Sequence, residues 1–420
     1  MMTGDGLLAR LMPSASIPLE TMISLCEASE RHGNGIVEVT QRGSLQIRGL
    51  SPLSAPRFAH AAVSLRLGMD GETPILTSPL TGMDLHEYAD LGALTVAVRD
   101  ELSRLTGRDA LGPKVSVLID GGGRLHLDEV LGDVRVQAGP DTRLHISLAG
   151  TAATSTSLGW VEPYLVPKAV AHVLAAIAQL GSSARARDLI NAREIEALRR
   201  SLAEVYAGEP PPRRARPEPI GRHPLKNGRL AVGIALPFGF THAALLKRVT
   251  AAAGRWGARD IRLAPGRALL ALDLTAKAAD GFVAAAAAED LIVAADDPRR
   301  HVVACAGAPA CASATLATRE LAPLIAHAAK SLLSDSFTVH VSGCAKGCAH
   351  AGAAELTLVG PDRIIVMGRA CARPDGFISP KSLISGLARL RCEQADHLDL
   401  MPKLGTTRVL EILGAVPARE

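Results

Sequence analysis

Two stretches decide the fold, IVEVTQRGSLQIRGL at residues 36–50 and DIRLAPGRALLALDL at residues 260–274, because they read as one unit written twice. Each consists of two strand-like runs around a short turn. An arginine falls at a similar place in each, Arg42 in the first and Arg267 in the second. This repetition predicts two matched half-domains.

The residues before each stretch repeat as well. Gly6 and Gly228 each lead a short apolar run, and helical patterns follow at residues 19–32 and 242–256. Glycines after both patterns are typical of helix ends. The common order of strand, helix, strand, turn and strand predicts a pseudo-twofold pair. A ligand site is expected at the junction, where pockets commonly form.

A proline-rich, charged segment at residues 209–219 divides the chain and is typical of a semi-rigid linker. Each half also continues beyond its repeated unit with alternating helical and strand-like patterns. The predicted organisation is a half-domain at 1–68, an α/β domain at 69–208, a linker at 209–227, a second half-domain at 228–295 and a cysteine-bearing α/β domain at 296–420. In the last of these, residues 312–333 are expected to form a helix directly after Cys311.

Composition excludes several classes of protein. A chain of 420 residues with 48% apolar content exceeds a single core and is typical of a globular protein with several domains. A net charge of +4 and 3% aromatic residues argue against nucleic-acid binding. The sequence has neither a signal-peptide pattern nor a long apolar run. A cytoplasmic location without membrane contact is therefore expected.

Four of the seven cysteines form two spaced pairs. Cys305 and Cys311 lie in CAGAPACASA, and Cys344 and Cys348 lie in SGCAKGCAH. Small residues surround both pairs and allow backbone N–H groups to approach sulfur. Four thiolates suit a [4Fe–4S] cluster. A structural zinc site is the main alternative, although five intervening residues fit zinc poorly, and four unligated buried cysteines are the third.

The remaining cysteines show no such pattern. Cys26 lies on an apolar helix face and is expected in the core, while Cys371 and Cys392 have no partner by spacing.

Several motifs, in this order along most of the chain, resemble the nitrite/sulfite reductase superfamily. They are VTQRGSLQIRGL at 39–50, ILTSPLTGMD at 75–84, GPKVSV at 112–117 and the two cysteine pairs. The resemblance implies an α+β fold. It implies duplicated ferredoxin-like half-domains plus two α/β domains that bind iron–sulfur and tetrapyrrole groups, related by pseudo-twofold symmetry.

Within that superfamily, the phrases HPLKNGRLAVGIALPFG, RLAPGRALL and VSGCAKGCAHAG resemble the precorrin-3B synthase family. The resemblance implies an oxidoreductase of aerobic cobalamin biosynthesis, an NADH- and O2-dependent monooxygenase that hydroxylates precorrin-3A with lactone formation. It implies a [4Fe–4S] cluster and admits a mononuclear non-haem iron. The sequence carries no dinucleotide-binding fingerprint, so an electron-donor protein is expected to pass on electrons from NADH.

The candidate site residues follow from these patterns and the resemblance. Cys305, Cys311, Cys344 and Cys348 are the candidate metal ligands, and no catalytic residue is identified. Precorrins carry many carboxylates, which guanidinium and ammonium groups bind well. The candidate substrate-binding residues are Arg42, Arg48, Lys114 and Arg267, each of which could instead be a solvated charge at a strand end. His340 and His350 flank the second cysteine pair. The preferred interpretation is that they are satisfied or exposed histidines, and the alternative is that they are ligands of a mononuclear iron.

Two other functions stay open. A sirohaem-dependent sulfite or nitrite reductase would use Cys348 to bridge to the sirohaem iron. Sulfite reductases have a further arginine shortly before the run matching LTSPLTG, where this chain reads DGETP at 70–74. The second lysine of their basic pair would fall near Ser116. Both absences favour a different substrate. An electron-transfer module is the third hypothesis, which the duplicated cavity-forming halves disfavour.

Overall fold

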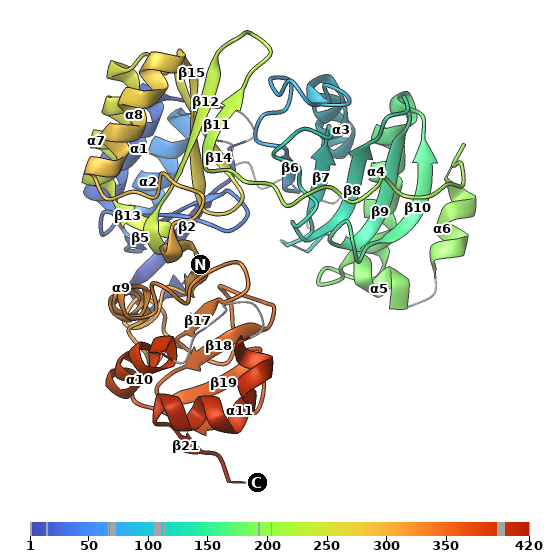
Figure 1. Ribbon diagram of the computed structural model, residues 1–420. Helices are drawn as coiled ribbons and strands as arrows, with labels where there is room; N and C mark the ends of the chain where they lie inside the picture. Colours follow the sequence, from blue (N-terminus) through green and yellow to red (C-terminus); the bar gives the residue numbers. More distant parts are fainter. Residues whose placement is uncertain are drawn as a thin grey trace.

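The computed structural model describes residues 2–13, 16–65, 67, 73–104, 111–112, 114–191, 194–202, 204–392 and 400–419. These described residues form a mixed α+β fold with four sheets (Figure 1). None of the helices in the described ranges is long and apolar enough to cross a membrane.

Two units share the same element order, as the repeated sequence predicts. We call them half-domain 1 and half-domain 2. Half-domain 1 contains β1 (Met2–Thr3), β2 (Gly6–Leu11), β3 (Ile17–Pro18), α1 (Leu19–His32), β4 (Ile36–Val39), β5 (Leu45–Leu50) and α2 (Ser54–Ser64). Half-domain 2 contains β11 (Gly221–Pro224), β12 (Leu230–Ala235), the short helix η3 (Pro237–Gly239), β13 (Phe240–His242), α7 (Ala243–Arg255), β14 (Asp260–Ala264), β15 (Ala268–Leu274) and α8 (Ala276–Ala288).

The duplication extends to the irregularities of the strands. The β2–β5 ladder shifts register between Leu7 and Ala9, and the β12–β15 ladder shifts between Leu230 and Val232. Bulges of this kind bend a strand and increase its twist. Two halves with the same bulge at the same place therefore curve their sheets in the same way.

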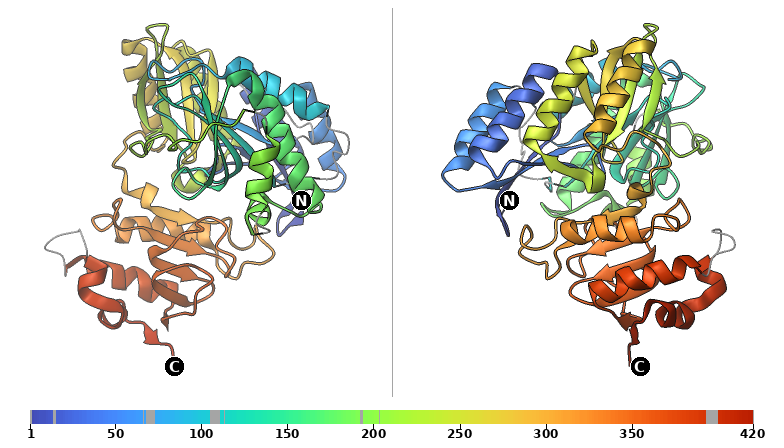
Figure 2. Two further views of the ribbon diagram at one scale, coloured as in Figure 1. Left: turned by 90° about the vertical axis from the view of Figure 1, so that its right-hand side faces the viewer. Right: turned by 60° about the vertical axis from the view of Figure 1, so that its left-hand side comes forward.

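The two half-domains exchange strands. Strand β3 of half-domain 1 pairs with β14, and strand β13 of half-domain 2 pairs with β4. The resulting sheets run β1-β2-β5-β4-β13 and β11-β12-β15-β14-β3. Helices α1 and α7 lie side by side (Figures 1 and 2), and one hydrophobic core contains buried residues of both halves, such as Leu25 and Leu246. The halves consequently form one body.

The other two sheets have matching topology. The β6–β10 domain contains β6 (Ile75–Thr77), α3 (Gly92–Ser103), β7 (Val117–Asp120), β8 (Gly132–Ala138), β9 (Leu144–Gly150), β10 (Thr156–Val161), η2 (Pro163–Leu165), α4 (Val166–Gln179), α5 (Ala186–Asn191) and α6 (Ile195–Ser201). The cysteine domain contains η4 (Pro298–His301), β16 (Val302–Ala304), α9 (Thr318–Ala328), β17 (Val339–Ser342), β18 (Ala354–Val359), β19 (Arg363–Gly368), β20 (Gly376–Phe377), α10 (Pro380–Cys392), α11 (Leu400–Leu413) and β21 (Val416–Pro417). In both sheets three parallel strands are followed by antiparallel ones.

The predicted helix directly after Cys311 is wrong in its limits, because α9 spans only Thr318–Ala328. Residues before it form a loop whose backbone bonds elsewhere. The Thr315 N–H donates to the Gly343 carbonyl and the Ala308 N–H donates to the Leu316 carbonyl. The small residues of this loop, which also carries Cys311, allow these close backbone contacts and do not form a helix.

The segment after residue 208 crosses from the β6–β10 domain to half-domain 2 (Figure 1). Strand β11 lies within the predicted linker at 209–227, so pairing with β12 begins earlier than the sequence indicates. The other predicted domain limits stay predictions.

The strand exchange makes Ile17 a test of the shared core. Ile17 is 1% exposed and pairs with Ile261 of the other half. Ile17→Ala is expected to lower the free energy of unfolding by about 2–5 kcal/mol. The same substitution at Leu53, which is 82% exposed, is the control. Denaturant unfolding followed by circular dichroism measures both. Equal stabilities of the two variants would contradict an essential role for the exchanged strand.

Candidate functional site

The four cysteines of the two pairs gather at one edge of the cysteine domain. Cys305 directly follows β16, and one residue, Gly343, separates Cys344 from the end of β17. Because β16 and β17 are parallel neighbours, their carboxyl ends meet at the same edge. The Gly343 N–H donates to the Cys305 Sγ atom at 3.2 Å. This is the kind of backbone contact that tunes a thiolate ligand.

The four cysteine side chains lie near one another. Burial raises the pKa of Cys348, and the charges of Cys344, Cys305 and Cys311 raise it further, so all four are within electrostatic reach. Among the described side chains, three ligand atoms come within 4.8 Å of one another only at a different place. Four thiols in one place can hold an iron–sulfur cluster or a zinc ion.

The N-terminal turn holds the loop between Cys305 and Cys311. The Gly4 N–H donates to the Ala310 carbonyl at 3.1 Å, and the Arg48 guanidinium donates to the same carbonyl. A Cβ on Gly4 would lie 2.2 Å from the Pro309 carbonyl oxygen, so only glycine allows this approach. Half-domain 1 therefore positions the backbone next to Cys311.

Arg48 belongs to this support and does not face open space. Its side chain is 4% exposed, and its Nε and Nη2 atoms each donate to the Asp5 carboxylate at 3.0 Å. The Glu38 carboxylate lies 3.6 Å from the Nη1 atom of Arg48 and also pairs with Arg319. With these donors engaged, the contacts favour a positioning role for Arg48 over the predicted binding of a substrate carboxylate.

Arg42 lines a pocket between both half-domains and the β6–β10 domain. The pocket is also lined by Met12, Pro13, Gly43, Ile75, Leu76, Thr77, Ser78, Pro79, Leu127, Arg262, Leu263 and Pro265. Arg42 Nη2 donates to the Leu131 carbonyl at 2.7 Å. Arg262, which the sequence analysis missed, donates to the Pro79 carbonyl at 2.7 Å, while its buried Nε has no partner in the described part of the chain.

Arg267 is not the repeat counterpart of Arg42, contrary to the sequence-based expectation. Val39 pairs with Leu45 and Leu263 pairs with Leu269, so the two hairpin turns have equal length. Counted from the strands, Arg267 matches Gly43 and not Arg42. Both occupy left-handed backbone, with φ of 74° at Gly43 and 64° at Arg267. Sequence alone cannot show this shift, because it depends on strand register.

The other predicted residues lie apart from Arg42. Lys114 is exposed on the turn before β7, and Ser116 is buried, with its N–H donating to Asp133 at 3.0 Å. Residues 70–72 of the DGETP stretch lie outside the described residues. Arg42 and Arg262 line the same pocket, whereas Arg48 lies at the cysteine loop and Arg267 packs against Gly239. The structure thus distributes the four candidate substrate residues over several places.

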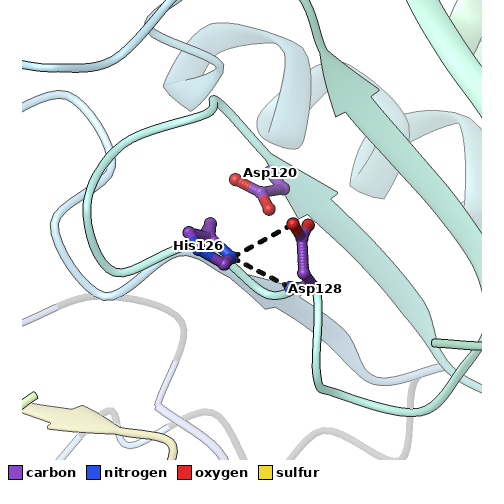
Figure 3. Close-up of side chains that lie close together, drawn as sticks. All are labelled: Asp120, His126 and Asp128. Carbon is purple, nitrogen blue, oxygen red and sulfur yellow. Dashed lines mark hydrogen bonds and ion pairs between the residues drawn. The ribbon is translucent and has the colours of Figure 1, made fainter. Parts of the chain in front are cut away.

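A second polar group lies in the β6–β10 domain, away from the cysteines. Ligand atoms of Asp120, His126 and Asp128 come within 4.8 Å of one another, and all three side chains are buried (Figure 3). Asp120 ends β7, and the other two lie in the loop before β8. Two carboxylates and an imidazole could in principle hold a mononuclear iron.

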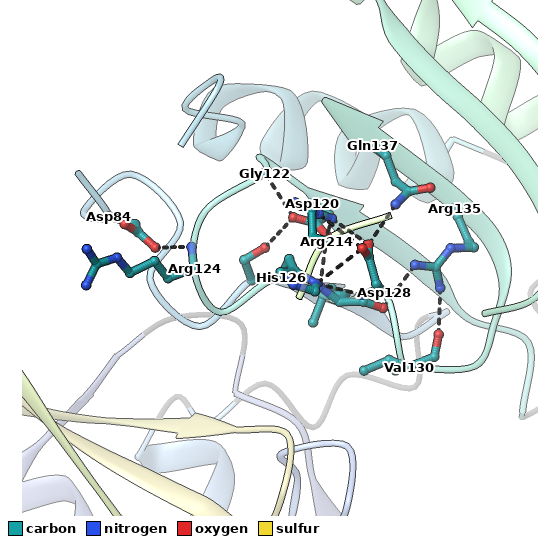
Figure 4. Close-up of polar contacts among 12 residues, drawn as sticks. Asp84, Asp120, Gly122, Arg124, His126, Asp128, Val130, Arg135, Gln137 and Arg214 are labelled. Carbon is teal, nitrogen blue, oxygen red and sulfur yellow. Dashed lines mark hydrogen bonds and ion pairs between the residues drawn. The ribbon is translucent and has the colours of Figure 1, made fainter. Parts of the chain in front are cut away.

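The donor set does not fit a metal, because Arg214 already occupies the position of a cation (Figure 4). Its Nη2 atom donates to Asp120 at 2.7 Å and to Asp128 at 2.5 Å, and its Nε donates to Asp128 at 3.1 Å. His126 is engaged at both ring nitrogens, with the Ala215 carbonyl at 2.8 Å and the Asp128 N–H at 3.3 Å. We derive no chemistry through an iron at this group.

Arg214 instead fastens the linker to the β6–β10 domain. Burial alone would raise the pKa of Asp120, but the charge and hydrogen bonds of Arg214 bring that pKa below the ordinary 3.8. The carboxylate stays ionised and paired at neutral pH. The sequence of the proline-rich segment gives no signal of this role, since the partners of Arg214 lie more than eighty residues earlier.

Comparisons with known proteins agree with this geometry. The model of the nitrite/sulfite reductase ferredoxin-like half domain matches residues 3–62. A precorrin-3B synthase of a Sinorhizobium species is 38% identical over 397 residues, which cover 93% of this chain and 86% of that protein. A ferredoxin–nitrite reductase of Synechococcus elongatus is 25% identical over 84% of this chain and 76% of its own length. The NirA protein of Mycobacterium tuberculosis has a similar fold, with a TM-score of 0.75 at 20% identity over 92% of this chain and 80% of that one.

The Arg214 contacts generate a stability prediction. Arg214→Met leaves two buried carboxylates unpaired and is expected to lower the free energy of unfolding by about 3–5 kcal/mol at neutral pH. The neighbouring exposed Arg213, changed to methionine, is the control.

The sign of the pH dependence follows from Asp120. Its folded-state pKa lies below 3.8, so its pairing stabilises the fold above that pH and is lost as the pH falls through the folded value. The difference between the two variants should therefore shrink in acid. Denaturant unfolding from neutral pH down to pH about 3 measures it, and a difference that grows in acid would refute the stabilising pairing of Arg214 with Asp120.

Proposed function

The chain belongs to the precorrin-3B synthase family, and on that premise we propose that it is an oxidoreductase converting precorrin-3A to precorrin-3B in aerobic cobalamin biosynthesis. The observation that carries the proposal is the relative of that name, 38% identical over nearly the whole chain. The gathered cysteines and the arginine-lined pocket support it.

The proposed reaction is a monooxygenation of an anionic tetrapyrrole. One oxygen atom of O2 enters the macrocycle as a hydroxyl group, and a carboxylate of the ring then closes a lactone. The other oxygen atom leaves as water after taking up an electron pair and protons. NADH is the proposed source of the electron pair, through a donor protein. We propose a cytoplasmic location, because NADH is available in the cytoplasm.

Cys305, Cys311, Cys344 and Cys348 are the proposed ligands of a [4Fe–4S] cluster, which when bound supplies single-electron transfer. The chain's part is to hold the ligands in place. The Gly343 N–H donates to the Cys305 sulfur, and the Thr318 hydroxyl donates to the Cys305 carbonyl at 2.6 Å. The Gly4 and Arg48 donors fix the Ala310 carbonyl next to Cys311. Such contacts limit the motion of the ligands.

Arg42 and Arg262 are proposed to bind substrate carboxylates at the pocket between the half-domains and the β6–β10 domain. Guanidinium groups match carboxylates in charge and geometry. Burial lowers the pKa of both arginines, which stay protonated at neutral pH, so each presents a weakly hydrated cation. Lys114, on an exposed turn, would contact only a substrate that extends beyond this pocket.

The ligand assignment predicts different effects for two partly exposed cysteines. Cys348→Ser should remove most of the cluster, because a serine hydroxyl is a poor ligand for iron–sulfur groups. Cys371→Ser, a matched change outside the two pairs, should leave it intact. Iron and acid-labile sulfide analysis of protein purified without oxygen measures both. A full complement in Cys348→Ser would refute the assignment.

An absorption spectrum of the anaerobically purified protein, with extraction of bound tetrapyrrole, tests the function. We expect a broad iron–sulfur shoulder and no extractable sirohaem, followed by consumption of O2 with precorrin-3A. A strong sirohaem band that extracts would instead support the sulfite or nitrite reductase alternative, which the more distant relatives suggest.

A further inference from the structure

Glu38 lies where three parts of the molecule meet. It belongs to β4 of half-domain 1, and it pairs across the exchanged strand with Phe240 of half-domain 2. The guanidinium of Arg319, from the first turn of α9 in the cysteine domain, pairs with the Glu38 carboxylate. The same guanidinium lies over the Phe240 ring, 4.5 Å from its centre. One strand pair therefore receives an arginine from a different domain.

The Glu38 carboxylate is shared with a second arginine. Its Oε1 atom lies 3.6 Å from Arg48 Nη1 and also pairs with Arg319. All three side chains are largely buried, with 14% of Glu38, 4% of Arg48 and 14% of Arg319 exposed. Charges that are partly removed from water interact more strongly than charges on the surface. Glu38 is thus the common counter-charge of two arginines that belong to different domains.

The two arginines lead to the two ends of the first cysteine loop. Arg48 donates to the carbonyl of the residue before Cys311. Arg319 directly follows Thr318, whose hydroxyl donates to the Cys305 carbonyl at 2.6 Å and lies 4.0 Å from the Cys305 sulfur. Contacts therefore run from one cysteine of the first pair to the other through a single carboxylate of half-domain 1.

The four charges at this junction balance. Arg48 and Arg319 supply two positive charges, and Glu38 and Asp5 supply two negative ones. Burial raises the pKa of Asp5, but hydrogen bonds from Arg48 and Thr3 outweigh it and bring that pKa below the ordinary 3.8, so the carboxylate is ionised at neutral pH. Burial lowers the pKa of Arg319, and the charge of Asp5 opposes this effect. Loss of one carboxylate would leave an excess positive charge beside the cysteine loop.

We propose that Glu38 is a positioning residue for the first cysteine pair, which joins both ends of the loop carrying Cys305 and Cys311 to the paired half-domains. Resting on the proposed function, this carboxylate also sets the charge beside the cluster and contributes to its reduction potential. An ion pair that only holds two domains together would change neither the mobility of the loop nor the potential. The positioning role concerns the thiols of the chain itself, whichever group they bind.

Glu38→Gln tests the positioning role, because it removes the charge and keeps the shape of the side chain. In the full chain freed of metal by a chelator, Cys305 and Cys311 should react with iodoacetamide about threefold faster or more, because the loop opens more easily. Cys344 and Cys348, on the other loop, should keep their rates within about twofold. Mass spectrometry of proteolytic peptides measures each cysteine separately.

Glu87→Gln is the matched control. Glu87 is another buried carboxylate in an ion pair between domains, 1% exposed and 3.0 Å from Lys226 of the turn between β11 and β12. Its loss should lower the stability of the chain without changing the reactivity of Cys311. An increase at Cys311 as large in Glu87→Gln as in Glu38→Gln would show general loosening and overturn the positioning role.

Protein that carries the cluster separates the charge of Glu38 from its reach. Glu38→Asp keeps the charge on a shorter side chain, whereas Glu38→Gln removes it. Excess positive charge favours the reduced cluster, so the glutamine variant should have a more positive reduction potential and the aspartate variant a potential like that of the natural chain. Both variants should lose iron to a chelator faster than the natural chain does. A redox titration followed by electron paramagnetic resonance measures the potentials, and equal potentials in Glu38→Gln and the natural chain would overturn the charge role.

The two roles and the proposed function fail separately. Cys311 reactivity that stays within about twofold in Glu38→Gln would overturn the positioning role and leave the proposed function standing. A natural chain that holds no iron–sulfur cluster would overturn the proposed ligand assignment and the charge role together. The reactivities of the thiols in the metal-free chain would still decide the positioning role.

Discussion

The reciprocal exchange of β3 and β13 is the constraint on which the remainder of the molecule depends. Each short strand leaves its own half and completes the sheet of the other, so neither sheet has its full order without its partner. Helices α1 and α7 pack together over the same core. One rigid body results, and it presents two hairpin turns, at 40–44 and 264–268, to the other domains.

Both α/β domains are tied to this body by charged groups that reach across domain boundaries. Arg214 binds two carboxylates of the β6–β10 domain, and Arg262 donates to a carbonyl of the same domain. On the other side, Gly4 and Arg48 donate to a carbonyl of the cysteine loop. Each contact joins residues far apart in the sequence. Their common effect is to hold the pocket and the cysteine loop in place against the paired half-domains.

The two halves have diverged at equivalent places, and the divergence is informative. The first hairpin has glycine at its left-handed position and directs Arg42 to the pocket, while the second has Arg267 at that position. Duplicated scaffolds allow such divergence, because one copy can keep the relaxed backbone while the other holds a larger side chain at a cost in backbone strain. The same logic applies to the α/β domains, of which only the second carries the cysteine pairs.

Much of the architecture was determined by the sequence alone. The repeated runs predict the two half-domains, and helix α1 begins and ends where its periodicity indicates, because these signals are local and strong. The cysteine spacing singles out four residues that lie within electrostatic reach of one another. Only the tertiary structure decided which arginines line the pocket and that Arg48 supports the cysteine loop. It also decided that Arg214 pairs with two buried carboxylates and that Arg267 is the structural counterpart of Gly43. Those outcomes depend on strand register and on contacts between residues distant in the chain, and neither leaves a periodic trace in the sequence.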